Sequence, residues 1–176
     1  MGLFTVTRQS ESLVKPSTPT PSETLELSIL DRMPGLRHQV RSLHVFKHGQ
    51  QPTKVIREAL AKALVPYYPF AGRFAVSTDH GEMVVECTGE GAWFVEATAN
   101  CSLEDVNYLD HPFLIPQDEL MPNPKVEGEV LDIPLMMQVT EFKCGGFIVG
   151  IISVHTIADG LSAAQFVKSH LADLAA

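Results

Sequence analysis

The clearest pattern along the chain is a helical one that begins near residue 52. Apolar residues recur there every three or four positions, behind a Pro52-Thr53 pair suited to a helix N-cap. The recurring apolar positions are Val55, Ile56, Ala59, Leu60, Ala63 and Leu64. Pro66 and Pro69 end the pattern, because proline has no backbone N–H to donate. The sequence therefore predicts one amphipathic helix that begins at Thr53.

Alternating and continuous apolar runs predict the strands. Short β-rich runs lie at residues 1–7 and 93–98, and 73–76 and 83–87 form a hairpin around an Asp79-His80-Gly81 turn. From Val40 to Phe46 the pattern alternates, which places Val40, Ser42, His44 and Phe46 on one side of a strand. Leu135 to Phe142 and Phe147 to Val154 predict a second hairpin. Its second run is almost entirely apolar, so we expect a buried central strand.

Proline and glycine separate these elements. Residues 16–22 form a Pro/Ser/Thr connector, and residues 110–129 carry Pro112, Pro116, Pro122 and Pro124, which predicts a long irregular surface excursion. A second helical pattern runs from Leu161 to Leu174, after Gly160. The order is mixed, without an internal repeat, and predicts a single α+β domain with a mixed β-sheet flanked by helices.

Composition excludes several classes of function. The chain has 176 residues and a formal net charge of -8, without a basic block, which argues against nucleic-acid binding. No apolar run approaches the ~20 residues that cross a bilayer, and the first residues do not follow the layout of a signal peptide. The three cysteines lie far apart without a C-x-x-C pair, so we expect neither a disulfide nor a metal site. A cytoplasmic protein that does not bind membranes is the expectation.

The chemically informative segment is the end of the last apolar strand. It reads Ser153-Val154-His155-Thr156-Ile157-Ala158-Asp159-Gly160 and places an imidazole and a carboxylate beside the most apolar run of the chain. Burying these groups costs several kcal/mol unless each is hydrogen-bonded or paired. From the spacing alone two readings stay open. His155 and Asp159 can be a catalytic pair, or a hydrogen-bonded strand-end histidine and a helix cap. A zinc site would need further ligands, and none is close in sequence.

Four segments, taken together, resemble the BAHD acyltransferases of plants, which move an acyl group from a coenzyme A thioester to an alcohol or amine. They match that family's landmarks in its order: Leu27-Ser28-Ile29-Leu30-Asp31, Tyr67-Tyr68-Pro69-Phe70-Ala71-Gly72-Arg73, Glu86-Cys87-Thr88-Gly89-Glu90-Gly91-Ala92 and His155-Thr156-Ile157-Ala158-Asp159-Gly160. Residues 90–96 and 135–142 are most similar to grass enzymes that place p-coumaroyl groups on monolignols. The resemblance implies a chloramphenicol-acetyltransferase-like amino-terminal domain.

The same resemblance implies the roles of the site residues. His155 would be the general base, and Asp159 and Gly160 would have a structural role at the active site. The strand at 40–46 would line the acceptor channel, so Ser42 and His44 could bind a substrate hydroxyl; an ordinary mixed sheet face is the alternative. Acyl-CoA would be a co-substrate, with no bound cofactor and no metal. We expect Tyr67, Tyr68 and Phe70 to be packing residues and Cys144 to be an inert turn cysteine.

Members of the resembled family continue through a carboxyl-terminal domain with an Asp-Phe-Gly-Trp-Gly landmark, which this chain lacks. Residues 1–176 would therefore be the amino-terminal acyltransferase domain, and the sequence from Val167 onward departs from the family pattern. Two hypotheses follow. The chain is one half of an enzyme that transfers a hydroxycinnamoyl group to an alcohol such as a monolignol, or it is a non-catalytic module of the same fold that binds a ligand or partner. Its exposed face would meet the missing domain or a second copy.

Overall fold

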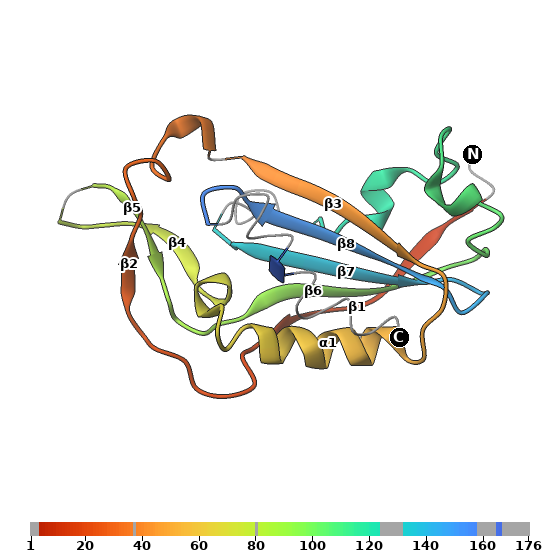
Figure 1. Ribbon diagram of the computed structural model, residues 1–176, viewed down its shortest axis with the longest axis horizontal. Coiled ribbons are helices and arrows are strands. Elements are labelled where there is room, and N and C mark those ends of the chain that lie inside the picture. The colour runs from red at the N-terminus through yellow and green to blue at the C-terminus, as the bar shows by residue number, and fades with distance from the viewer. Residues whose placement is uncertain (1–3, 37, 80, 124–131, 158–164, 167–176) are drawn as a thin grey trace.

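The computed structural model describes residues 4–36, 38–79, 81–123, 132–157 and 165–166. A twisted main sheet lies beside a smaller sheet, and one long helix runs along the main sheet (Figure 1). The main sheet has the strand order β1-β6-β7-β8-β3 and the smaller one the order β2-β5-β4. This mixture of sheet and helix is the α+β architecture predicted from the sequence.

All neighbours in the main sheet are antiparallel except β6 and β7, which run parallel. The strands are β1 (Val6–Val14), β3 (Gln39–Phe46), β6 (Ala92–Ala99), β7 (Leu135–Glu141) and β8 (Phe147–Val154). The predicted hairpin of β7 and β8 is confirmed. Every residue of β8 is buried, because β7 and β3 flank it and side chains cover both faces. Strand β1 extends to Val14, further than the prediction.

The smaller sheet consists of β2 (Thr24–Glu26), β4 (Arg73–Val76) and β5 (Met83–Glu86). Strands β4 and β5 form the predicted antiparallel hairpin, with Arg73 paired to Glu86. Strand β2, which the sequence did not predict, adds to β5 through Leu25 and Val85. This sheet lies at the end of the main sheet where β8 ends (Figure 1), so it forms one side of the site described below.

Helix α1 (Pro52–Ala63) confirms the predicted helix, and its buried positions include Ile56, Leu60 and Ala63. These side chains share one hydrophobic core with Phe94, Val139 and other residues of the main sheet. The predicted side-chain cap is wrong: the N-cap is Gln51, in a left-handed conformation, and no side chain caps the helix. Proline stands at the first turn instead, where its missing N–H costs no hydrogen bond.

The opposite face of the main sheet is covered by the segment between β6 and β7. Residues Asn107–Leu109 and Gln117–Leu120 form short 3-10 helices, η3 and η4, and Ile115 and Leu120 are fully buried. The predicted surface excursion is confirmed for most of residues 110–120, which are exposed, but Ile115 and Leu120 anchor it in a hydrophobic core with Ile148 of β8. The polar residues and prolines around Ile115 and Leu120 gave no indication in the sequence that these two side chains are buried. Residues 124–129 lie outside the described residues.

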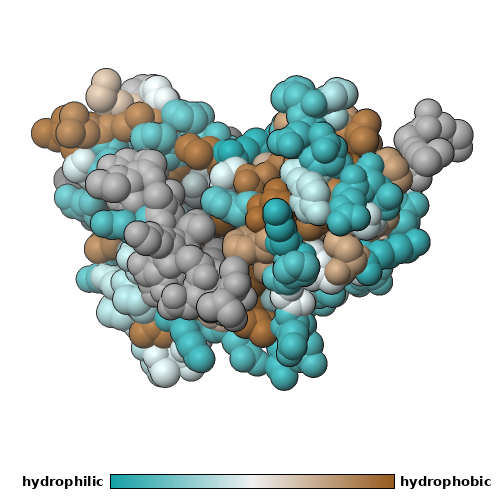
Figure 2. All heavy atoms as spheres, turned by 45° about the vertical axis from the view of Figure 1, so that its right-hand side comes forward, coloured by the Kyte–Doolittle hydropathy of each residue, from teal (hydrophilic) through white to brown (hydrophobic). Residues whose placement is uncertain are grey.

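Apolar side chains also remain on the surface. The large exposed ones include Ile29, Leu30 and Met33 after β2, and Phe113 and Leu114 before η4. On the face shown in Figure 2, hydrophobic and hydrophilic side chains are interspersed. The predicted helix from 161 to 174 lies outside the described residues, except for residues 165 and 166. Phe166 is buried against Phe70, with ring centroids 5.2 Å apart.

Gly150 is the position where η4 approaches the main sheet most closely. A Cβ atom at Gly150 would lie 2.1 Å from the carbonyl oxygen of Leu120. Gly150→Ala should therefore lower the free energy of unfolding by about 1–3 kcal/mol, the usual cost of overpacking, as measured by urea denaturation. Gly35→Ala is the matched control, since a Cβ there meets nothing within 4 Å. Equal stability of the two variants would show that η4 does not pack on β8 as described.

Candidate active site

His155 follows the last residue of β8 directly, at the point where the chain leaves the main sheet. Its backbone N–H donates a hydrogen bond to the carbonyl of His38 over 3.0 Å, which continues the pairing of β8 with β3 by one step. The N–H of Ile157 then donates to the carbonyl of Val154 over 3.1 Å and turns the chain. The backbone of His155 is thus held between a strand and a turn.

The side chain of His155 is half-buried, and its two ring nitrogens have different surroundings. Nδ1 is buried without a hydrogen-bond partner among the described residues. Nε2 does not share both of these properties. A buried polar atom without a partner is costly and is a frequent sign of a functional position. If His155 acts on a substrate, Nε2 is the nitrogen that remains for that contact, because Nδ1 is buried.

A second histidine lies beside this ring. The ring centroids of His38 and His155 are 5.1 Å apart, with the planes tilted by 38°. Nδ1 of His38 lies 2.9 Å from the carbonyl oxygen of Gly35. Because a carbonyl only accepts, Nδ1 must carry a proton and donate it. His38 is exposed. His38 could not be identified from the sequence, since no local pattern indicates that the two histidines meet.

The segment before β3 is also held by Thr156. The buried Thr156 hydroxyl donates to the carbonyl of Leu36 over 3.1 Å, and His155 bonds to His38 two residues further on. The short 3-10 helix η1 (Pro34–Leu36) is thus fixed to the turn that carries His155. Two hydrogen bonds from consecutive residues thus hold together the two backbone segments that carry the imidazoles.

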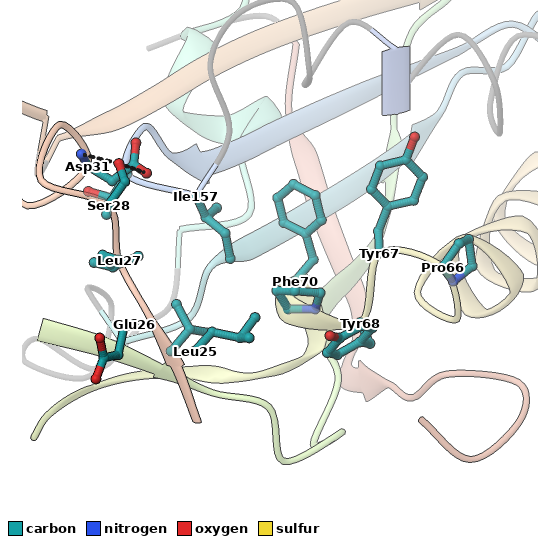
Figure 3. A pocket seen from close by; sticks show the side chains of 13 residues that line it. Leu25, Glu26, Leu27, Ser28, Asp31, Pro66, Tyr67, Tyr68, Phe70 and Ile157 are labelled. Carbon is teal, nitrogen blue, oxygen red and sulfur yellow. Dashed lines mark hydrogen bonds between the residues drawn. The ribbon is translucent and has the colours of Figure 1, made fainter. Parts of the chain in front are cut away.

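A pocket of about 340 Å³ lies next to this turn (Figure 3). The described residues that line it are Leu25, Glu26, Leu27, Ser28, Asp31, Pro66, Tyr67, Tyr68, Pro69, Phe70, Val85, Thr156 and Ile157. We call it the β2 pocket. His155 is not one of its lining residues, although the next two residues are. Tyr67 and Phe70 do pack, against Phe166, but they also face this pocket, which the sequence analysis did not predict.

Ser42 and His44 lie on the face of β3 that the alternation predicted. They pair with Ile151 and Val149 of β8, and Nε2 of His44 lies 3.1 Å from the hydroxyl oxygen of Ser42. Partial burial lowers the pKa of His44 by desolvation. Because Ile151 is four residues before His155, Ser42 stands roughly 13 Å from it along the sheet, at about 3.3 Å per residue. The structure therefore does not bring Ser42 or His44 next to His155.

The remaining predicted site residues, Asp159 and Gly160, lie outside the described residues. Cys144 is exposed in the turn between β7 and β8, and its sulfur accepts the N–H of Leu103 over 3.4 Å. Within the described ranges, no group of three or more His, Cys, Asp and Glu side chains could hold a metal ion. None of the helices described is long and apolar enough to cross a membrane.

Comparison with known sequences gives one consistent result. The sequence model of the Transferase family matches residues 4–176. Acyl transferase 4 of Oryza sativa subsp. japonica is 58% identical, over 94% of this chain and 40% of its own length. Myricetin 3-O-glucosyl 1,2-rhamnoside 6'-O-caffeoyltransferase AT2 of Crocosmia x crocosmiiflora is 50% identical, over 92% of this chain and 38% of its own length. The chain thus spans about 40% of the length of these relatives.

Comparison with solved structures agrees. Vinorine synthase superposes with a TM-score of 0.78 at 28% identity, over 96% of this chain and 42% of its own. F. graminearum TRI101, solved with coenzyme A and T-2 mycotoxin, superposes with a TM-score of 0.59 at 12% identity, over 77% of this chain and 35% of its own. The second likeness supports the fold alone. Together they confirm the fold class predicted from the sequence.

The lowered pKa of His44 predicts a pH dependence of stability. Below the unfolded-state pKa of 6.5, His44 binds a proton in the unfolded chain more readily than in the folded one. The free energy of unfolding therefore falls as the pH decreases through this range. His44→Gln should make this fall less steep, as measured by urea denaturation between pH 7.5 and 5. His48→Gln is the control, because His48 is exposed in the loop after β3. If both variants keep the original slope, burial of His44 does not contribute.

Proposed function

Since the chain belongs to the BAHD acyltransferases, the Transferase family of plants, we propose that it is the amino-terminal part of a hydroxycinnamoyltransferase. The acyl group, p-coumaroyl or a close analogue, would pass from coenzyme A to an alcohol such as a monolignol. A relative at 50% identity is named a caffeoyltransferase, and caffeoyl is a hydroxycinnamoyl group. Because the chain spans about 40% of its relatives' length, the active enzyme would contain further chain that forms the other wall of the site.

The position of His155 is the single observation that carries the mechanism. The hydrogen bond to His38 fixes its backbone, Nδ1 faces inward, and Nε2 is the nitrogen left for a substrate. A neutral imidazole is a suitable base near pH 7 when its nitrogen lies within ~3 Å of the proton that it removes. For Nε2 to accept a proton, Nδ1 must carry one, and its partner would then come from outside the described residues.

The proposed reaction is a direct transfer in a ternary complex. The acceptor hydroxyl gives its proton to Nε2 of His155 as its oxygen attacks the thioester carbonyl. The tetrahedral adduct collapses, the carbon–sulfur bond breaks, and the proton on His155 passes to the departing coenzyme thiolate. No acyl-enzyme is formed, and no group other than the acyl-CoA and the alcohol is consumed.

The other predicted site residues have supporting roles in this proposal. Asp159 and Gly160 would shape the turn after His155, with Asp159 directed away from the substrate. Ser42 and His44, at roughly 13 and 20 Å from His155 by strand spacing, could meet only the far end of an acceptor. Their contact with one another gives a substrate hydroxyl both an oxygen and a nitrogen to bind.

The alternative function, a non-catalytic binding module, rests on a different observation. The β2 pocket is formed entirely within this chain, and His155 does not line it. A module that binds a small ligand would need the pocket but not the imidazole. Ligand binding that survives the loss of His155, in a protein that turns over no acyl-CoA, would favour this alternative.

The role of His155 predicts a large kinetic effect. In the protein at the full length that its native transcript encodes, His155→Ala should lower kcat for p-coumaroyl transfer to coniferyl alcohol by about 10²- to 10⁴-fold, the usual contribution of a general base. The release of free thiol measures the rate. His48→Ala is the control, since this exposed histidine lies away from the site. A rate within threefold of the unaltered protein would refute the assignment.

Direct transfer also predicts that no covalent intermediate accumulates. Incubation with p-coumaroyl-CoA alone should leave the mass of the intact protein unchanged. Cys144→Ser should keep nearly full activity, because the exposed sulfur of Cys144 accepts a backbone N–H, and no base among the described residues is hydrogen-bonded to it. A stable mass increase that disappears in Cys144→Ser would replace direct transfer with a covalent mechanism.

A further inference from the structure

The β2 pocket lies beside the turn that carries His155, but neither the family landmarks nor the mechanism above gives it a role. We propose that it binds the hydroxyphenyl ring of a phenylpropanoid substrate, either the acyl group of the donor or the body of the acceptor alcohol. This assignment rests on the proposed function and identifies the substrate class that this wall of the site recognises.

The size and lining of the pocket suit an aromatic ring with a short side chain. Its volume of about 340 Å³ is near the lower end of small-molecule sites, which span ~300–1,000 Å³. Most of the lining is apolar and comes from four separate regions: β2 with the residues after it, the residues before β4, Val85 of β5, and the turn after β8. Figure 3 shows Leu25 and Ile157 extending toward one another across the pocket, with Phe70 and Tyr67 on the other side. Such walls favour flat apolar groups.

The charges around the pocket exclude the anionic part of coenzyme A. Among the described lining residues the charged side chains are Glu26 and Asp31, both acidic, and none is basic. Arg32, the next residue along the chain, is directed to Glu26 and Glu82 in ion pairs. Phosphates would be repelled here, whereas a neutral group that donates hydrogen bonds would be favoured. A phenolic ring fits this requirement.

The polar corner of the pocket is already organised. The hydroxyl of Ser28 donates to Oδ2 of Asp31 over 2.6 Å, and the N–H of Asp31 donates to the hydroxyl oxygen of Ser28 over 3.2 Å. These reciprocal bonds, drawn in Figure 3, hold the carboxylate at the edge of the apolar cavity. A carboxylate has about four acceptor sites, so Asp31 keeps capacity to accept a hydrogen bond from a phenolic hydroxyl.

The pocket also has the right connection to the reacting centre. Thr156 and Ile157 line it and directly follow His155. The Thr156 hydroxyl is occupied by the carbonyl of Leu36, so this wall is fixed. A ring held between Leu25 and Phe70 would extend its three-carbon side chain past Thr156 toward His155, where the side chain carries the reacting group of either substrate.

The test changes the volume of the pocket in opposite directions at one position. Leu25→Phe should fill it and Leu25→Ala should enlarge it, in the protein at its full native length. Val76→Phe is the matched control, because Val76 is 66% exposed on β4 of the same small sheet and does not line the pocket. Calorimetric titration would give Kd for coniferyl alcohol, p-coumaroyl-CoA and acetyl-CoA, the last of which lacks a ring.

We expect Leu25→Phe to weaken the binding of one ring-bearing probe by roughly tenfold or more, the discrimination typical of an apolar pocket, with acetyl-CoA unchanged. The affected probe identifies whether donor or acceptor supplies the ring. Leu25→Ala should shift preference toward rings with two methoxy groups. Unchanged Kd values, or the same loss of affinity in Val76→Phe, would overturn the proposal. An equal loss of affinity for both ring-bearing probes would also overturn it, because one pocket holds one ring per turnover.

Kinetics on the same proteins separate this proposal from the proposed function. If the unaltered protein transfers no hydroxycinnamoyl group but Leu25→Phe still weakens the binding of a ring-bearing probe, the function fails and the pocket assignment holds. If the unaltered protein transfers p-coumaroyl groups and both Leu25 variants bind every probe as it does, the pocket assignment fails and the function holds.

Discussion

The hydrogen bond from the N–H of His155 to the carbonyl of His38 determines the geometry of the whole site. Strand β8 is buried along its full length, so its polar end must find partners as it leaves the sheet. The bond to His38 and the Thr156–Leu36 bond supply them. They fix the turn that carries His155 and that leads into Ile157 beside the β2 pocket. Mechanism and pocket both depend on this connection.

The sequence predicts correctly those helices and strands that are determined by the pattern of their own residues. Helix α1 has an uninterrupted three-and-four spacing between proline boundaries, and β7 and β8 are long apolar runs on either side of a glycine pair. His155 could be identified because the strand before it is so apolar that an imidazole at its end is conspicuous. Its assignment as a base came from the resemblance of four segments, since the spacing to Asp159 did not decide between catalysis and capping.

Contacts between distant segments could not be predicted in this way. The His38–His155 ring pair joins residues more than a hundred positions apart, and the β2 pocket combines four separate regions of the chain. Likewise η4 packs on β8 because Gly150 leaves room for the Leu120 carbonyl, although the surrounding prolines indicated only a loop. Tyr67 and Phe70 were expected to pack, and they do, but whether an aromatic cluster also borders a cavity depends on what stands opposite.

In the proposed mechanism, Nε2 of His155 receives the proton of the acceptor alcohol. The decisive experiment is a structure of the full-length protein with coniferyl alcohol and a non-hydrolysable p-coumaroyl-CoA analogue. We expect the alcohol oxygen to lie within ~3 Å of Nε2 of His155, a productive distance for a general base. An acceptor oxygen bound to a different side chain, with Nε2 of His155 turned into the protein, would contradict it.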